Sequence, residues 1–550
     1  MIPSEATGMP DHPNDERLDS WKEIATYFRR DVRTVRLWEE KEGLPVHRHI
    51  HHTGGSVYAY KPELDAWREG RRSGTSKRTR NFSLAVLPFK NLSSDPEQVF
   101  LGDGLTEEMI TQLSRLRADQ LHVTACASVM LYKDSDKSIE QIAHELGVNF
   151  LLQGTVRRDG DRMRITVQLI DVRRKTNLWA EVYEHSISNV FALQSELAER
   201  IASSLDIGLL RSTREMLRVR TTYSPAAFDA HLKGRYHWNK RTRQGLEKAV
   251  GCFEEAIRFD PEYPLPYSGL ADAYTMLAGY GLLSPADAMP KARAAALKAV
   301  ELDPSLAEAH ASLGEVKMYF DWEWDSAERQ YRRAIDLQPG YTSAHYWYAN
   351  LLCVLQRETE ALQQVSQALH CDPLSPLTNA WAGLIFYHCG RYDSAARQCQ
   401  LVLDMEPSYA LAHWVLGMAQ EQRGKPDEAI KELRKAVAHD GGSSRSIGSF
   451  GHACGAAGHK QEALQALHDL KHQRQQGYIS AYDIAVAYAG LEKKDAAIES
   501  LKKAFEEHAT WLPFVAVDPR LNNLHSNVAF QELLHGMRLR VVERTLLQHS

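Results

Sequence analysis

The sequence predicts a chain of several domains, in which two α/β segments precede a long all-α segment. Three observations support this prediction. A chain of 550 residues is longer than a single hydrophobic core usually organises. Charge is uneven, because residues 20–80 carry a net charge of +6 whereas residues 81–550 carry −7. Beyond residue 228, prolines and small residues recur with a spacing of 34 residues.

The composition is that of a soluble globular protein, with 43% apolar and 25% charged residues. It excludes a mostly disordered chain, a collagen-like chain and a disulfide scaffold. The seven cysteines form no CxxC pair, which is typical of reduced thiols in the cytoplasm. The polar N-terminus is not a secretory signal, and no apolar run is long enough to cross a bilayer. We therefore expect a cytoplasmic protein without a membrane partner.

The first domain is predicted at residues 18–71, after a disordered tail at residues 1–17. Residues 19–28 have apolar side chains at helical spacing, and Asp31 can cap a second helix over residues 32–42. Together they indicate a helix-turn-helix.

A β-hairpin is expected to follow the two helices, with its turn at Gly54 and Gly55. A closing helix is expected to begin at Pro62. Trp21, Trp38 and Trp67 are expected to form the small core of the domain.

The segments SWKEIA, RTVRLWE, GLPVHR, VYAY and ELDAW resemble the winged-helix DNA-binding domain of the MerR/excisionase type. The resemblance implies that the second helix enters the major groove of duplex DNA and that the hairpin contacts the flanking backbone. Arginine is the commonest reader of guanine edges. The candidate DNA contacts are Arg29, Arg30, Arg33, Thr34, Arg36, His47, Arg48 and His49. The alternative is that these charges only solvate a surface; two-fold DNA half-sites would make a homodimer plausible.

The histidines of the hairpin also suggest a metal site. On a strand, His47, His49 and His51 share one face, which suits zinc. No cysteine or carboxylate stands nearby to complete the ligand set, so we expect no metal.

The second domain is predicted at residues 82–210, after a flexible linker at residues 72–81. The order βαβαβββα predicts a mixed sheet with helices on one face. Thr106 is expected to cap the first helix, Gly147 to end the second, and Asp159-Gly160 to form a hairpin turn.

The segments AVLPFKNLS, FLGDGLTEEMITQL, VNFLLQGTVRRDGDRMRITVQLID and FALQSELAERIA resemble the amino-terminal domain of TolB and FlgO-like domains. That resemblance implies an interaction or sensory role and no chemistry. The GDG at residues 102–104 lacks the GxxxxGK[ST] pattern of a phosphate-binding loop, so we interpret it as a structural turn.

The all-α segment is defined by its 34-residue period. Alanines recur in step at positions 327, 361, 395, 429, 463 and 497, and prolines at positions 304, 339, 373 and 407. The alanines fit where two helices cross closely, and each proline ends a helix because it lacks a backbone donor. The pattern resembles the tetratricopeptide repeat. We predict an all-α solenoid of about eight repeats over residues 228–511, closed by a capping helix pair at residues 512–550.

The repeat resemblance also implies a binding surface, because the first helix of each repeat lines a concave groove. The predicted groove residues are Tyr319, Tyr346, Asn350, Tyr387, His388, Trp414 and Met418. An aromatic, Met-containing lining predicts an unknown protein or peptide held by apolar anchors. The alternative is that neighbouring helices or the capping pair cover these residues.

These observations favour a cytoplasmic DNA-binding transcriptional regulator. The second domain and the solenoid would act as protein-interaction or signal-input modules. The alternative is a signalling scaffold that binds no DNA. No GxSxG, HExxH or kinase pattern is present, so we expect neither an enzyme nor a cofactor.

Overall fold

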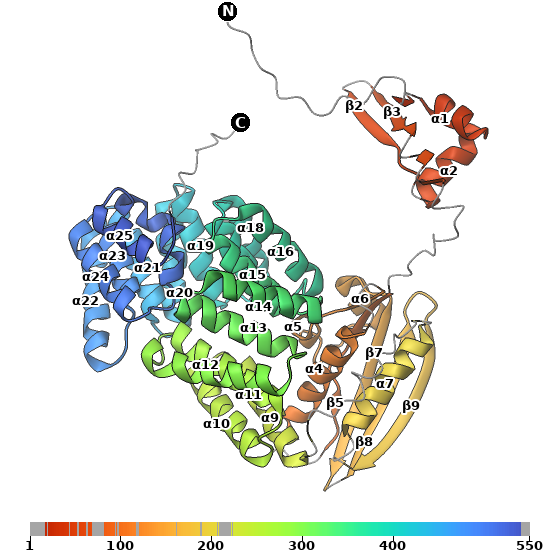
Figure 1. Ribbon diagram of the computed structural model, residues 1–550, viewed down its shortest axis with the longest axis horizontal. Coiled ribbons are helices and arrows are strands. Elements are labelled where there is room, and N and C mark those ends of the chain that lie inside the picture. Colours follow the sequence, from red (N-terminus) through yellow and green to blue (C-terminus); the bar gives the residue numbers. More distant parts are fainter. Residues whose placement is uncertain are drawn as a thin grey trace, which may run out of the picture. The chain divides into compact units, whose positions relative to one another are not determined.

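The computed structural model describes two compact units, one within residues 1–80 and one within residues 81–550 (Figure 1). The described chain runs from residue 17 to residue 540. It omits residues 19, 43, 52–53, 62–63, 66, 69–81, 94, 96–97, 117–119, 161, 187–189, 206, 208–221 and 223. Residues 1–16 of the predicted tail, the linker and the last ten residues therefore lie outside the described residues. The last residue of the predicted 1–17 tail, Arg17, belongs to a strand, because it pairs with Tyr60.

The described part of the first unit includes helices α1 (Trp21–Phe28) and α2 (Val32–Glu42) and a small antiparallel sheet. The two helices are joined by a short turn. Strands β1 (Arg17–Leu18), β3 (Gly54–Tyr60) and β2 (His47–His51) lie in that order. The fully buried core comprises Ile24, Ala25, Val35, Leu44, Ala59 and Leu64, and the three tryptophans pack around it. The winged-helix assignment itself stays a prediction.

The hairpin is present, but its turn is not where the sequence suggested. Gly54 and Gly55 are paired with His51 and Ile50, so both glycines belong to β3. The connection between the strands is residues 52–53, outside the described residues. The glycines misled the prediction because a Gly-Gly pair is a strong turn signal.

The second unit begins with a mixed sheet, as predicted. Its elements are β4 (Phe82–Val86), β5 (Lys90–Asn91), α4 (Phe100–Ser114), β6 (Leu121–Val123), α5 (Cys126–Met130), α6 (Ile139–Leu146), β7 (Phe150–Asp159), β8 (Arg162–Asp171), β9 (Thr176–Ser186) and α7 (Val190–Ser204). The strand order is β6-β4-β7-β8-β9, with β5 paired to β7. Strand β4 is parallel to β6 and β7, whereas β8 is antiparallel to β7 and β9. Gly147 ends α6 in the left-handed conformation, as expected.

The predicted cap at Thr106 is wrong, because α4 begins six residues earlier, at Phe100. The Thr106 hydroxyl donates to the Gly102 carbonyl at 2.7 Å and accepts from the Phe89 amide at 2.9 Å. The GDG segment therefore lies inside a helix and is not a turn. A Cβ on Gly102 would stand 2.3 Å from the Phe89 carbonyl oxygen, so the glycine permits a close approach of helix and loop.

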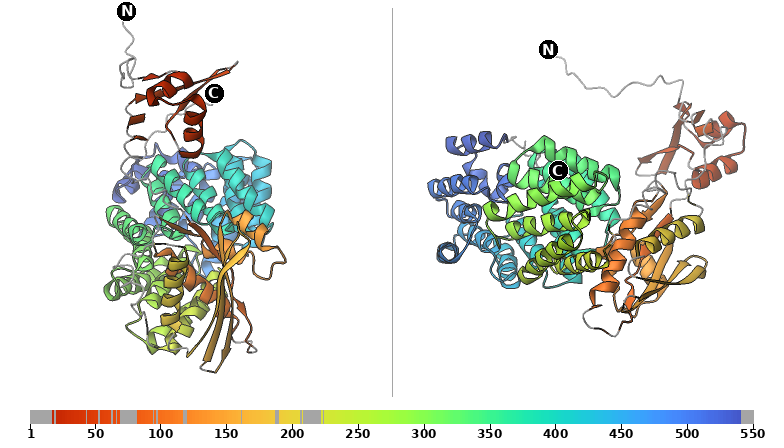
Figure 2. Two further views of the ribbon diagram at one scale, coloured as in Figure 1. Left: turned by 90° about the vertical axis from the view of Figure 1, so that its right-hand side faces the viewer. Right: turned by 60° about the horizontal axis from the view of Figure 1, so that its bottom comes forward.

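The remainder of the described chain is an all-α solenoid of antiparallel helix pairs (Figures 1 and 2). The pairs are α9 (Pro225–Asn239) and α10 (Arg243–Phe259), α11 (Pro264–Gly279) and α12 (Pro285–Leu302), α13 (Ala307–Val316) and α14 (Trp324–Leu337), α15 (Thr342–Val354) and α16 (Glu358–Cys371), α17 (Pro376–His388) and α18 (Tyr392–Met405), α19 (Ala410–Gln422) and α20 (Pro426–His439), α21 (Ser444–Ala456) and α22 (Lys460–Gln476), and α23 (Ala481–Gly490) and α24 (Lys494–Glu506). A single π-helical turn, η4 (Lys317–Asp321), extends α13.

The periodic residues occupy the positions that their chemistry predicts. All six in-step alanines, at 327, 361, 395, 429, 463 and 497, are fully buried. Each periodic proline lies two residues after a helix end. Its carbonyl accepts a side-chain hydrogen bond from the next helix, at 2.8–2.9 Å. The donors are His310, His345, Asn379 and His413. At these four junctions the bond ties the end of one helix pair to the first helix of the next.

The C-terminal segment differs from the expected helix pair. It forms two 3₁₀ turns, η5 (Leu512–Ala516) and η6 (Pro519–Leu524), and one α-helix, α25 (Val528–Gly536). The η5 turn packs against α15 and η4, which are far from it in the sequence. The segment therefore reaches back across the solenoid.

The sheet domain and the solenoid are packed against each other within the second unit. Helix α4 contacts both the sheet and α9 (Figure 1). Arg235 of α9 donates to the Glu107 carboxylate of α4. At a second point, the Ser128 amide and hydroxyl donate to Asp372 at 3.0 and 2.6 Å. Two separate parts of the solenoid thus hold the sheet domain.

Candidate functional site

The first candidate site is the exposed face of α2 in the first unit. Asp31 caps this helix, since its carboxylate accepts from the Thr34 amide at 2.8 Å and from the Thr34 hydroxyl at 2.7 Å. Val35 is buried in the core, whereas Arg33, Arg36 and Leu37 are exposed.

Thr34 was predicted to contact DNA, but its hydroxyl hydrogen bonds to Asp31 and holds the helix cap. The hydroxyl proton of Thr34 is therefore already used in a hydrogen bond to Asp31. Its side chain is also only half-exposed. The structure thus gives Thr34 a capping role, and its contact with DNA stays a prediction.

Two further arginines lie in the turn that precedes α2. Arg29 ends α1 in the left-handed conformation, with φ 54°, and Arg30 follows it directly. Both side chains are exposed. Arg36 lies with its guanidinium 5.2 Å from the centre of the Trp21 ring, so the core tryptophan helps to position it. Several exposed guanidinium groups that lie close together can contact DNA phosphates and base edges.

The remaining residues that are predicted to contact DNA lie in the hairpin. In β2, His47 pairs with Tyr58, Arg48 with Val57 and His49 with Ser56. The side chains of residues 47–51 lie outside the described residues. The predicted phosphate contacts and the alternative zinc site therefore stay predictions.

The second candidate site is the concave side of the solenoid, and here the structure differs from the predicted open groove. The predicted residues are buried: Tyr319, Tyr346, Asn350, Tyr387, His388, Trp414 and Met418 are each at most 6% exposed. Of these, Asn350, Tyr387 and Met418 have no exposed surface. A partner could not reach most of these side chains.

The C-terminal segment accounts for much of this burial. Phe514 stacks on His388, with ring centres 4.6 Å apart, and lies 6.3 Å from Tyr319. Trp511 meets the edge of Trp414 at 5.5 Å. The alternative given in the sequence analysis, that the capping segment covers the predicted groove residues, therefore applies to this part of the groove. The capping elements pack into the concave surface as well as closing the end of the solenoid.

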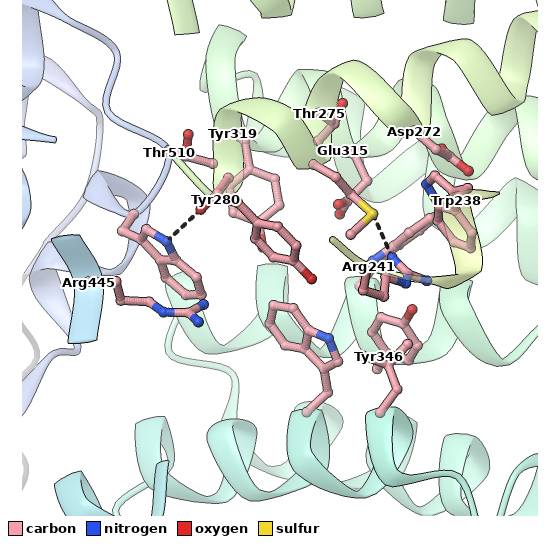
Figure 3. Close-up of a pocket in the computed structure, with 16 residues that line it drawn as sticks. Trp238, Arg241, Asp272, Thr275, Tyr280, Glu315, Tyr319, Tyr346, Arg445 and Thr510 are labelled. Atoms are coloured by element: carbon pink, nitrogen blue, oxygen red, sulfur yellow. Dashed lines mark hydrogen bonds between the residues drawn. The ribbon is translucent and has the colours of Figure 1, made fainter. Parts of the chain in front are cut away.

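A pocket remains open beside this filled region (Figure 3). It lies among the first helices of several repeats, and Trp511 forms part of its wall. The space open to the centre of a water-sized molecule is about 80 Å³. Of the predicted groove residues, Tyr319 and Tyr346 line it. Figure 3 shows Tyr280 and Tyr346 entering the pocket from opposite sides.

Sequence reasoning missed the charged members of this pocket. Arg241 and Arg445 line it, together with Asp272 and Glu315. Burial raises the pKa of the Asp272 carboxyl to about 6 and that of the Glu315 carboxyl to about 8. The Ser312 hydroxyl donates to Asp272 at 2.6 Å, and the Tyr331 hydroxyl donates to Glu315 at 2.8 Å. Glu315 and Tyr319 are four residues apart, a helical spacing that could have signalled a shared face.

Comparison with known families supports two of the three predicted modules. Residues 79–222 match the model of the second domain of HilA/YgeH-like transcriptional regulators. Residues 323–376, 382–444 and 479–507 match tetratricopeptide repeat models. The chain thus contains a HilA-like regulator domain followed by tetratricopeptide repeats, which confirms the repeat prediction. The more specific TolB and winged-helix resemblances stay predictions.

Individual relatives cover parts of the chain. The transcriptional regulator HilA of Salmonella typhimurium is 24% identical over 65% of this chain and 62% of its own length. The putative adenylate cyclase 3 of Rhizobium meliloti is 31% identical over 51% of this chain and 41% of its own length. The chain therefore spans less than two thirds of either relative. A solved structure of YrrB, a tetratricopeptide repeat protein with an unusual peptide-binding site, matches 34% of the chain at 23% identity and a TM-score of 0.24.

Within the described residues, no helix combines the length and apolarity that are needed to cross a membrane.

Proposed function

We propose that the protein is a DNA-binding transcriptional regulator whose first unit binds duplex DNA through α2 and the β2–β3 hairpin. The observation that carries this proposal is the group of exposed arginines at the start of α2, formed by Arg29, Arg30, Arg33 and Arg36. They lie in a segment with a net charge of +6 in an otherwise acidic chain. The HilA-like domain and the similarity to HilA favour transcription as the process.

The sheet domain and the solenoid are proposed to provide the input. Tetratricopeptide repeats are a common scaffold for protein or peptide binding, and this solenoid is packed on the HilA-like domain through Glu107 and Asp372. A partner or ligand at the solenoid could therefore act on the regulator domain through direct contacts. In this proposal the protein works in the cytoplasm and catalyses no reaction.

DNA binding is tested with Arg33→Ala and Arg36→Ala combined in the full chain. The probe is a mixed-sequence duplex, measured by fluorescence anisotropy over a series of salt concentrations. The slope of log affinity against log salt is about −0.9 per neutralised phosphate. We expect the double variant to bind DNA more weakly. The salt slope should become shallower by an amount that corresponds to the loss of up to about two phosphate contacts.

The matched control is Arg173→Ala with Arg174→Ala, which removes the same charge from an exposed turn of the sheet domain. It should leave binding almost unchanged. Equal binding by the α2 variant and the wild type would contradict the proposal and favour the scaffold alternative. An affinity of the wild type for DNA that does not change with salt concentration would also contradict the proposal.

A further inference from the structure

The pocket of the solenoid has walls made largely of stacked aromatic rings. Tyr346 and Trp381 are nearly parallel, with ring centres 5.9 Å apart, and Trp381 and Trp511 continue the row at 6.3 Å. These three rings come from α15, α17 and the segment before η5. Flat rings in a row present a surface on which a planar apolar group can stack.

An arginine stands near each end of this row. Arg445 lies over Trp414 at 4.4 Å and over Trp511 at 5.5 Å. Arg241 lies over Trp238 at 3.5 Å, near the other end. Burial raises the pKa of the Tyr346 hydroxyl to about 12, and the positive charge of Arg241 opposes that shift. Stacking on indole rings holds both guanidinium groups in place.

Among the residues that the structure describes, no ion pair within 4.0 Å is formed by either arginine, although Arg241 acts electrostatically on the Asp272 carboxyl and Arg445 on that of Asp483. The hydrogen-bond partner of Arg241 is the thioether of Met276, a weak acceptor, and the buried Nε of Arg445 has no partner. A guanidinium that is partly withdrawn from water without a counter-charge is costly. An anion in the pocket would supply that counter-charge.

The carboxyl groups of the pocket neutralise the arginines only in part: the Asp272 carboxyl, with a pKa of about 6, interacts electrostatically with Arg241. Asp272 accepts a hydrogen bond from Ser312 and lies 4.0 Å from Arg235, which is a different arginine. Glu315 is held by the Tyr331 hydroxyl. At neutral pH, the raised pKa of Glu315 keeps most of this carboxyl uncharged. The pocket therefore has a net positive charge.

We infer that this pocket binds a small organic anion with a planar aromatic body. The body stacks on Tyr346 and Trp381, and the acidic group pairs with Arg241 or Arg445. The space open to the centre of a water-sized molecule is about 80 Å³, several times what one water molecule needs. This site goes beyond the proposed DNA binding and does not depend on it.

The test is isothermal titration calorimetry of the full chain with three aromatic acids and their amides. The probes are benzoate, indole-3-acetate and naphthalene-2-carboxylate, each compared with the uncharged amide of the same shape. We expect at least one acid to bind with a Kd of about 1 mM or tighter. Its amide should bind at least about tenfold more weakly, because it cannot form the charge-assisted bond to a guanidinium.

Variants of the pocket locate the binding. Arg241→Gln and Arg445→Gln are each tested. At least one of these variants should bind the aromatic acid about tenfold more weakly than the wild type, or weaker still. Lysine at the same positions keeps the charge and should recover part of the affinity, which guards against a variant that merely misfolds. Arg397→Gln removes an exposed arginine of α18 and is the matched control.

Three results would overturn the inference. They are the absence of binding by every acid, equal binding of acids and amides, and unchanged affinity in the Arg241→Gln, Arg445→Gln double variant. Binding of a peptide that ends in tryptophan, with none of the free acids binding, would also overturn it in favour of a peptide partner. DNA binding is measured separately at α2, so failure of one proposal is distinguishable from failure of the other.

Discussion

At the scale of single residues, close approach explains glycines that the sequence alone left ambiguous. Gly102 and Gly154 both face Phe89, and an added Cβ would meet the Phe89 carbonyl oxygen or ring within 2.6 Å. Thr106 then binds the Phe89 amide. These contacts attach the loop between β4 and β5 to helix α4. The small residues serve the packing of the sheet domain.

Gly102→Ala should therefore destabilise the sheet domain. Overpacking of a tight site costs about 1–3 kcal/mol, because backbone must move. Gly251→Ala is the matched control: it lies inside α10, nothing stands within 4 Å of its added Cβ, and alanine favours a helix. Urea unfolding followed by circular dichroism should show a lower midpoint for Gly102→Ala and an equal or higher one for Gly251→Ala. Equal midpoints for Gly102→Ala and wild type would contradict the packing role.

Glu315 predicts a pH dependence of stability. Its pKa rises from an ordinary value of 4.5 to about 8, mainly because of burial; the Tyr331 hydroxyl opposes this shift and Asp272 adds to it. Between these two pH values the unfolded chain has lost the proton that the folded chain keeps. Stability contributed by this group therefore falls as pH rises through that window, by up to about 1.4 kcal/mol per pH unit.

Glu315→Gln removes this titration, so its melting temperature relative to wild type should rise between pH 5 and pH 8, a span set by the pKa shift. Differential scanning fluorimetry across that range measures the difference. Glu532→Gln, at an exposed position of α25, controls for the loss of a surface carboxyl. A difference between Glu315→Gln and wild type that does not change with pH would contradict the assignment.

At the scale of elements, the sequence predicted the features that arise from local or repeated patterns of residues. It did not predict the features that arise from contacts between distant segments. The 34-residue period was visible because every repeat has the same close helix crossing, with a buried alanine such as Ala327 or Ala429. The mixed sheet followed from the order of apolar runs. The start of α4 was missed because glycines inside a helix resemble a turn. The filled groove was missed because contacts such as Phe514 with His388 join distant segments and leave no local pattern.

The C-terminal segment is predicted to be a structural part of the solenoid. Phe514 is 1% exposed, so Phe514→Ala should cost about 3–5 kcal/mol, as for other buried aromatic side chains. Phe259→Ala is the control, because this side chain at the end of α10 is 51% exposed and should cost far less. Thermal unfolding measures both. A small effect of Phe514→Ala would mean that the segment is only loosely attached and that the groove can open.

At the scale of the whole molecule, the solenoid contacts the HilA-like domain at several points, two of which are far apart in the solenoid sequence. The first is the pairing of Arg235 with Glu107, close to the start of the solenoid. The second lies between Ser128 and Asp372, at the junction of α16 and α17. A change in the curvature of the repeats between these points would strain the sheet domain. The aromatic pocket shares α9 with the first of these contacts, because Trp238 lines the pocket and Arg235 bonds to Glu107.

The second contact is built around a buried carboxylate. Asp372 is 3% exposed and accepts from the Ser128 amide, the Ser128 hydroxyl and the Thr378 hydroxyl, at 2.6–3.0 Å. A backbone bond from the Ala125 amide to the Cys371 carbonyl, at 3.0 Å, lies beside it. Asp372→Ala would leave several buried donors without an acceptor, at about 1–3 kcal/mol for each one that water cannot reach.

We expect Asp372→Ala to release α5 and the start of α17 from each other while the rest of the solenoid keeps its stability. Hydrogen exchange of the full chain should increase at residues 125–130 and 374–379, because local opening depends on the stability of those contacts. Asp393→Ala, which removes a 64% exposed carboxylate paired with Arg423, is the matched control and should leave both segments protected. Faster exchange spread evenly over all repeats would show that Asp372 stabilises the solenoid alone. Faster exchange confined to the two segments would show that it joins the solenoid to the HilA-like domain.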